Sequence, residues 1–190
     1  AWLDPIMPGY VYKFDILALD RQSGAVVWQR TARTESPHEG THQDGSWAPA
    51  SPVTDGERVY AHFGSRGLYC YTLSGKLKWK RTDFGKLTMR NGFGEGSSPT
   101  IDGDKLIVPW DHEGQSSVYA LNKANGKTIW RTDRDEPSCW ATPLRSGRRP
   151  ALESRAAYSA VQYPREKLRS RWNSPAKHWL VSISVAGPMS

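Results

Sequence analysis

Residues 16–28 read ILALDRQSGAVVW, and related phrases return at 68–79 (LYCYTLSGKLKW) and at 118–130 (VYALNKANGKTIW). Each phrase closes on a tryptophan that follows a glycine by four residues. Both residue types recur at a constant step of 51 positions: Gly24, Gly75 and Gly126, and Trp28, Trp79 and Trp130. A fixed period of this length is typical of proteins that repeat one supersecondary unit. The sequence therefore predicts a repeat architecture.

The repeated phrase has the composition of a β-hairpin. Two β-prone runs flank a short polar turn that ends in glycine. In the first copy Asp20 can accept hydrogen bonds from the backbone that follows it, and Gly24 supplies the positive φ that closes such turns. Asn122 can make the same local hydrogen bond in the third copy.

A second hairpin recurs between these phrases. Residues 51–60 (SPVTDGERVY) match residues 98–107 (SPTIDGDKLI), and each copy has an Asp-Gly turn between β-prone runs. A further copy begins at 141–143, where the pattern stops. One full repeat is therefore four short antiparallel strands, which is the blade of a β-propeller.

We therefore expect an all-β fold, a partial β-propeller of four-stranded antiparallel blades with an irregular or helical C-terminal tail. The expected incomplete propeller occupies residues 1–144, with an outer half-blade at 14–31, whole blades at 48–81 and 97–131, and the start of a next blade at 140–144. Residues 145–190 are expected to form a basic tail outside the propeller.

Composition agrees with strands and turns, because the chain has nine tryptophans, 17 glycines and 13 prolines. The chain has no apolar run of about 18 residues, so no membrane span is predicted. Cys70 and Cys139 stand far apart and outside any metal-ligand spacing, so buried free thiols are favoured. The chain starts at Ala1 without a signal peptide, and we expect a processed chain or a fragment.

The net charge of +7 belongs entirely to the tail, because residues 145–190 hold nine Lys and Arg against two Asp and Glu. Arg, Ser, Ala and Pro make up 25 of these 46 residues. Three interpretations remain open: a basic helical segment (156–169), a disordered tail, or a sequence read out of frame, which we favour. Nucleic acid is an unlikely partner, because no stacking aromatic residues are interleaved with the basic ones on a recognisable fold.

The hairpin phrases resemble the tryptophan motif of the pyrroloquinoline-quinone-like (PQQ-like) propeller repeat, A-x-D-x-x-T-G-K-x-x-W. The resemblance covers roughly residues 14–144, and the matching positions are Ala18, Asp20, Gly24 and Trp28, then Gly75, Lys76 and Trp79, then Ala120, Gly126, Lys127 and Trp130. The resemblance implies that the tryptophan packs between neighbouring blades, where the glycine allows close approach. It also implies a bacterial protein of the periplasm or a secreted one.

The family includes both quinoprotein dehydrogenases and catalytically silent propellers. Its dehydrogenases hold the quinone against a disulfide between adjacent cysteines, with a calcium ion and an aspartate base. Cys70 and Cys139 are not adjacent, and no segment matches the calcium ligands. We therefore expect a non-catalytic binding or protein-interaction scaffold, with no catalytic, cofactor or metal residues in this segment. The alternative is a fragment of a PQQ-dependent alcohol or sugar dehydrogenase, with PQQ and calcium, whose active centre lies outside this chain.

Blade geometry places the long loops 34–47, 85–96 and 134–140 on one face, together with the shorter 64–67 and 111–116. Long loops on a rigid scaffold usually carry binding, so an unknown protein or small-molecule ligand is expected on this face. The candidate residues there are Arg66, Glu95, Asp111, His112 and Glu113. Asp111, His112 and Glu113 could bind a cation or exchange protons. A hydrogen-bonded loop is favoured, because adjacent side chains diverge and no second His or Cys stands at ligand spacing.

The glycine-rich stretch 91–96 (NGFGEG) resembles a nucleotide-binding fingerprint only superficially. No helix is expected after it whose N-terminus could hold a phosphate. We interpret it as a turn.

Overall fold

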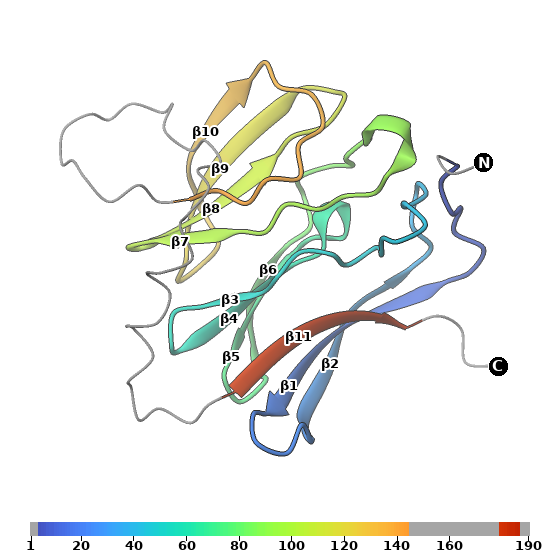
Figure 1. Cartoon of the computed structure of the whole chain (residues 1–190). Coiled ribbons are helices and arrows are strands. Elements are labelled where there is room, and N and C mark those ends of the chain that lie inside the picture. The colour runs from blue at the N-terminus through green and yellow to red at the C-terminus, as the bar shows by residue number, and fades with distance from the viewer. Residues whose placement is uncertain (1–3, 145–178, 187–190) are drawn as a thin grey trace, which may run out of the picture.

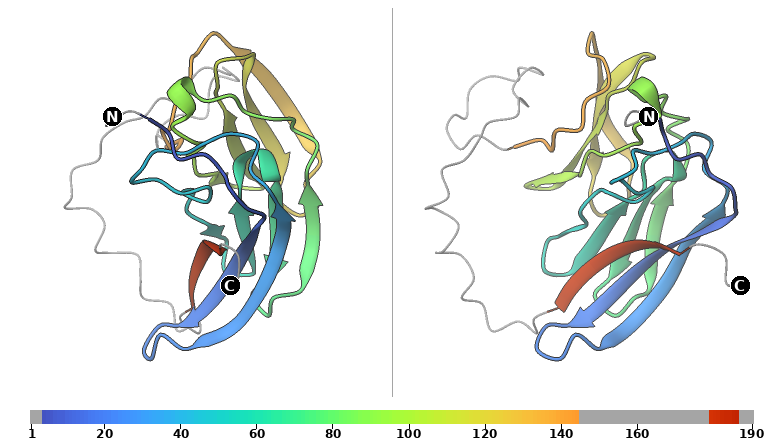
Figure 2. Two further views of the ribbon diagram at one scale, coloured as in Figure 1. Left: turned by 90° about the vertical axis from the view of Figure 1, so that its right-hand side faces the viewer. Right: turned by 45° about the vertical axis from the view of Figure 1, so that its right-hand side comes forward.

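The structure is a computed structural model that describes residues 4–144 and the backbone of residues 179–186. Its strands form three antiparallel sheets that follow one another like the blades of a fan (Figures 1 and 2). The first sheet contains β1 (Tyr12–Asp20), β2 (Val26–Glu35) and β11 (Trp179–Ala186). The second contains β3 (Val53–Thr54), β4 (Arg58–His62), β5 (Leu68–Thr72) and β6 (Leu77–Arg81). The third contains β7 (Thr100–Asp102), β8 (Lys105–Trp110), β9 (Ser116–Asn122) and β10 (Thr128–Arg134).

The strand orders β3-β4-β5-β6 and β10-β9-β8-β7 confirm the predicted partial propeller of four-stranded antiparallel blades. Two single turns of 3₁₀ helix interrupt the loops, η1 (Gly64–Arg66) and η2 (Arg90–Gly92). Neither these turns nor any other helical stretch in residues 4–144 has the length and apolar character needed to cross a membrane.

The middle strands of the second sheet, β4 and β5, are buried on both faces, because this sheet lies between the first and the third. In β5, Tyr69 and Tyr71 pack toward the first sheet, whereas Leu68 and Cys70 pack toward the third. Successive side chains of a strand point to opposite faces. A strand covered on both sides therefore reads as a continuous apolar run, as LYCYT does.

The tryptophans of the repeat join each sheet to the next one along the chain. The Trp28 indole Nε1 donates to the Leu73 carbonyl at 2.9 Å, and Trp79 Nε1 donates to the Lys123 carbonyl at 3.1 Å. Each ring lies flat on the repeat glycine of the following sheet. A Cβ added at Gly75 would come within 2.9 Å of Trp28, and one at Gly126 within 2.6 Å of Trp79.

Two arginines strengthen the same seams. Arg30 Nε donates to the Gly75 carbonyl at 3.0 Å, and Arg81 Nη1 donates to the Gly126 carbonyl at 2.7 Å. Both arginines lie two residues after the tryptophan, which places them on the same side of the outer strand. The indole and guanidinium therefore hold the turn of the next sheet together.

A β-bulge precedes every repeat tryptophan. Ala18 pairs with Trp28 but Leu19 pairs with Val26, which leaves Val27 as the extra residue. The same shift leaves out Lys78 before Trp79 and Ile129 before Trp130. A bulge re-aims the side chain beside it. In this protein the bulge changes the direction of the indole, so that it faces the neighbouring sheet.

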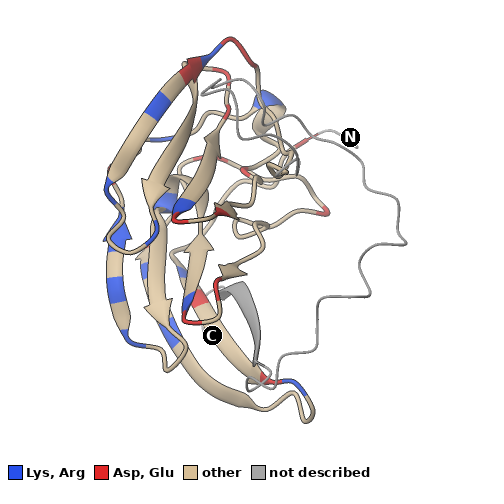
Figure 3. Cartoon of the chain, turned by 90° about the vertical axis from the view of Figure 1, so that its left-hand side faces the viewer, with Lys and Arg blue, Asp and Glu red and all other residues tan. Residues whose placement is uncertain are grey.

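The outer strands carry a row of basic residues (Figure 3), including Lys78, Lys80 and Arg81 on β6 and Arg131 and Arg134 on β10. Charged side chains on a sheet edge discourage pairing with other chains. The edges that the blades present to the outside are protected in this way.

The Asp-Gly turn of the second sheet also contacts the third sheet. The Asp55 carboxylate accepts the N–H of Arg58 at 2.8 Å and the Tyr60 hydroxyl at 3.0 Å, and it lies 3.2 Å from Lys123 Nζ. Burial alone would raise the pKa of Asp55, but these donors together lower it to about 2. Asp55 is thus a charged link between two repeats.

We expect Asp55→Asn to reduce the free energy of unfolding by up to about 2 kcal/mol at neutral pH, since a depressed carboxylate pKa stabilises the folded state. This contribution is complete above the unfolded pKa of about 4 and disappears as the pH falls through about 2. Urea unfolding across this range should therefore show the difference between the two proteins closing toward low pH. A difference that stays constant with pH would mean that the Asp55 charge is not involved.

One described part of the C-terminal tail, residues 179–186, departs from the sequence-based expectation. Residues 179–186 form β11, which pairs antiparallel with Lys13 to Asp20 of β1 (Figure 1). The first sheet therefore has three strands, and this part of the tail belongs to a blade rather than lying outside the propeller. The other tail interpretations, including the helix at 156–169 and a reading-frame error, concern residues outside the described ranges. At 140–144 no strand is assigned, although a next blade was expected to start there.

Candidate functional site on the long-loop face

The loops that follow β2, β6 and β10 lie side by side and are tied to one another. We call this surface, formed by residues 36–49, 83–99 and 135–143, the long-loop face. The His38 ring Nε2 lies 2.7 Å from the Leu87 carbonyl, the Arg90 N–H donates to Ser138 Oγ at 2.9 Å, and the Trp140 indole donates to the Gly94 carbonyl at 2.7 Å. Side chains thus position each loop on the next one.

Arg66 forms a buried ion pair with Glu95, which belongs to the loop after β6. Arg66 belongs to η1, between β4 and β5, and its side chain is 1 % exposed. Its Nη1 lies 3.0 Å from Glu95 Oε2, which also accepts the N–H of Ser65 at 2.7 Å. Gly64 has a φ of +56°, and any Cβ there would collide with the Glu95 carboxylate. The turn therefore requires glycine so that Glu95 can enter.

The guanidinium of Arg66 uses only some of its hydrogen-bond donors. It lies over the ring of Phe14, 5.1 Å from its centroid, and Nε is 4.0 Å from Glu35 Oε1. Nε and Nη2 have no hydrogen-bond partner among the described residues. A buried charge with unused donors makes folding depend strongly on its one close partner, Glu95.

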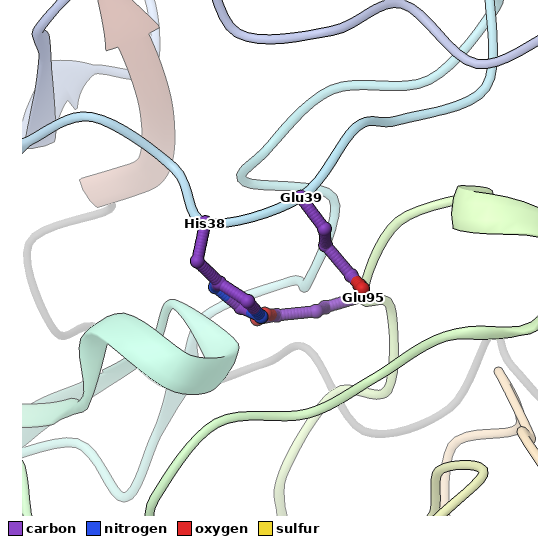
Figure 4. A group of neighbouring side chains, drawn as sticks. All are labelled: His38, Glu39 and Glu95. Atoms are coloured by element: carbon purple, nitrogen blue, oxygen red, sulfur yellow. The ribbon is translucent and has the colours of Figure 1, made fainter.

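His38 and Glu39 complete the cluster from the loop after β2 (Figure 4). His38 Nε2 lies 3.9 Å from Glu95 Oε1, and the Glu39 carboxylate accepts the N–H of Met89 with each oxygen at 3.2 Å. Burial raises the pKa of Glu39, more than the Met89 N–H lowers it. In Figure 4 the three side chains point toward one another from two different loops.

A cavity of about 10 Å³ lies next to this cluster, lined among others by His62, Glu95 and Asp111. Each of these residues has one buried atom without a hydrogen-bond partner in the described part of the chain: His62 Nε2, Glu95 Oε1 and Asp111 Oδ1. Burial lowers the pKa of His62, which favours the neutral imidazole. A polar cavity of this size has room for about one water molecule.

Asp111, His112 and Glu113 point in different directions. Asp111 is buried and its Oδ2 lies 3.3 Å from Arg134 Nη1, while Glu113 accepts the Ser138 hydroxyl at 2.7 Å on the outside. His112 Nδ1 accepts the N–H groups of Thr88 and Gly114, both at 3.3 Å. The three side chains therefore serve three separate loop contacts.

Of the five candidates, the structure brings together only Arg66 and Glu95, with Asp111 across the small cavity. Sequence reasoning missed Glu39 and His62. Glu39 directly follows His38 in a long polar loop, which was a usable signal. His62 ends a buried strand, and nothing in its surroundings in the sequence distinguishes it.

The fold and the repeated seams define the chain as a β-propeller segment of PQQ-like repeats. The sequence profile of one family, described as outer membrane protein assembly factor BamB, matches residues 13–172. The chain belongs to that family. No curated protein matches it with significant sequence similarity.

Solved structures with a similar fold include BamB and two dehydrogenases. BamB from Moraxella catarrhalis is 15 % identical with a TM-score of 0.44, and the alignment covers 70 % of this chain and 35 % of that one. A europium-containing methanol dehydrogenase is 16 % identical (TM-score 0.43; 63 % of this chain, 21 % of that one). Quinohemoprotein alcohol dehydrogenase from Comamonas testosteroni is 15 % identical (TM-score 0.43; 63 % and 18 %). The chain thus aligns with about a third of the length of BamB and with less of the two enzymes.

Proposed function

We propose that this chain is part of a non-catalytic propeller in the bacterial periplasm or outside the cell, and that it binds a protein or small-molecule partner on the long-loop face. One observation carries the proposal: the polar side chains of this face bind the loops to each other. The side chains of His38, Ser138 and Trp140 each join their loop to one from a neighbouring repeat. A surface fixed in this way can bind a partner without paying the entropy of ordering its loops.

The cysteines support a scaffold rather than quinone chemistry in this segment. Cys70 lies in the core of β5 and burial raises the pKa of its thiol to about 12, whereas Cys139 lies in the loop after β10. A thiol with so high a pKa is a poor nucleophile at neutral pH. The membership in the BamB family agrees with a protein-interaction role.

A photo-crosslinking amino acid placed on each face tests the proposal in the native envelope. Positions 90 and 140 lie on the long-loop face, and the exposed Ser74 and Asp104 lie in turns on the opposite face. We expect discrete adducts from Arg90 and Trp140 and none from Ser74 or Asp104. Adducts that come only from the turn face would place the binding surface elsewhere.

An equilibrium titration with PQQ and calcium examines the enzymatic alternative. A scaffold should show no saturable quinone binding and no dye-linked alcohol oxidation. Tight binding together with alcohol oxidation would show instead that this segment carries a dehydrogenase centre.

A further inference from the structure

We propose that His38, Glu39 and Glu95 bind one divalent transition-metal ion, such as Zn²⁺. One ligand atom from each residue lies within 4.8 Å of the other two (Figure 4). The inference goes beyond the scaffold function, because the ion would hold two loops of the long-loop face together whatever partner that face binds.

The unpartnered oxygen of Glu95 points to a ligand independently of the cluster itself. Glu95 is 7 % exposed, and its Oε2 is fully occupied by Ser65 and Arg66. Its Oε1 is buried, has no hydrogen-bond partner in the described residues, and faces His38 Nε2 at 3.9 Å. A buried carboxylate oxygen without a donor is costly. A cation between Glu95 and His38 would remove that cost.

The local charges also favour a cation. Glu39 and Glu95 contribute two carboxylates, and Arg66 neutralises Glu95 from the side away from His38. Within residues 4–144 no lysine or arginine forms an ion pair with Glu39, whose hydrogen-bond donor is the Met89 N–H. That backbone bond orients the carboxylate, as hydrogen-bond partners of metal ligands do.

The donor set selects the class of metal. One imidazole nitrogen with two carboxylates suits zinc and its first-row neighbours, whereas calcium takes oxygen ligands in larger number. In a tetrahedral zinc site the ligand atoms stand about 3.5 Å apart, so the loops must close slightly on binding. His38 Nε2 must also release the Leu87 carbonyl, which it contacts at 2.7 Å. Three protein ligands leave one position for water.

Calorimetric titration of the metal-free 190-residue chain with Zn²⁺ tests the site, with Co²⁺ absorption as a direct report on the ligands. We expect one saturable site per chain. Both His38→Gln and Glu39→Gln should weaken binding by about 100-fold or more, because losing a direct ligand reduces metal affinity more than losing a ligand's hydrogen-bond partner does. His38→Gln should also change the visible bands of bound Co²⁺.

His42→Gln is the matched control, because His42 lies in the same loop beside the exposed Asp44 and outside the cluster. It should bind Zn²⁺ like the wild type. Glu39→Gln retains an oxygen for the Met89 N–H, so its fold should persist, which circular dichroism verifies. Unchanged affinity in folded Glu39→Gln, loss of binding in His42→Gln alone, or tighter binding of Ca²⁺ than of Zn²⁺ would each overturn the assignment.

Discussion

Gly75→Ala should lower the free energy of unfolding by about 2–4 kcal/mol, whereas Gly24→Ala at the equivalent turn should cost about 1–2 kcal/mol. The two glycines share the repeat position and have φ values of +79° and +72°. Both substitutions therefore carry the same free-energy cost of placing alanine in the left-handed backbone region. Only at Gly75 does the new Cβ meet an indole, 2.9 Å from Trp28, while the space beside Gly24 is open in the described structure.

Urea unfolding of both variants measures the difference directly, with the repeat sequence itself as the control. Because backbone strain cancels between the two positions, the difference in destabilisation is the free-energy cost of displacing Trp28 from the second sheet. Equal destabilisation at Gly24 and Gly75 would show that the ring does not need this close approach.

Arg66→Met should destabilise the protein by about 3–5 kcal/mol, because it leaves the Glu95 carboxylate buried without its cation. Glu95→Gln should have a comparable effect by leaving Arg66 unpaired, although the amide can still accept the Ser65 N–H. The double variant should lose much less than the sum of the two, since it buries no uncompensated charge. Chemical unfolding with a chelator present measures all three variants free of metal.

The exposed pair Lys105–Asp104 provides the comparison for this cycle. Its atoms lie 3.1 Å apart, close to the 3.0 Å of Arg66–Glu95, but in contact with solvent. Lys105→Met should therefore change stability by no more than about 1 kcal/mol. If the buried pair behaved like the exposed one, or if the two single substitutions simply added, the Arg66–Glu95 contact would not be holding the loops.

The fold was predictable because the paired strands are neighbours in the sequence and are joined by turns with recognisable residues. Asp-Gly and the glycine four residues before tryptophan specify hairpins whatever surrounds them. The bulges before Trp28, Trp79 and Trp130 were not predictable, because a register shift depends on what the re-aimed ring meets in the neighbouring sheet. Strand β11 was missed for a related reason, since β-propensity depends on the partner strand and the basic composition around it suggested none.

The site could be predicted only as far as the face on which it lies. Arg66 and Glu95 are 29 positions apart in loops without periodicity, so nothing in the sequence pairs them. Asp111, His112 and Glu113 illustrate the opposite error. Being neighbours in sequence made them look like one site, but successive residues at a strand end point in different directions. Proximity along the chain was therefore a poor guide to proximity in space.

The tryptophan contacts between sheets have a consequence for how such a protein can gain repeats. Each reaches forward, from Trp28 to the turn of the second sheet and from Trp79 to that of the third. A single 51-residue repeat thus carries both the tryptophan that contacts the next sheet and the turn that receives the tryptophan of the preceding one. Tandem duplication of one repeat in a gene would therefore supply the contact between the two new sheets without a compensating substitution in the neighbouring repeats. The number of blades can change in this way while the contact between sheets stays the same.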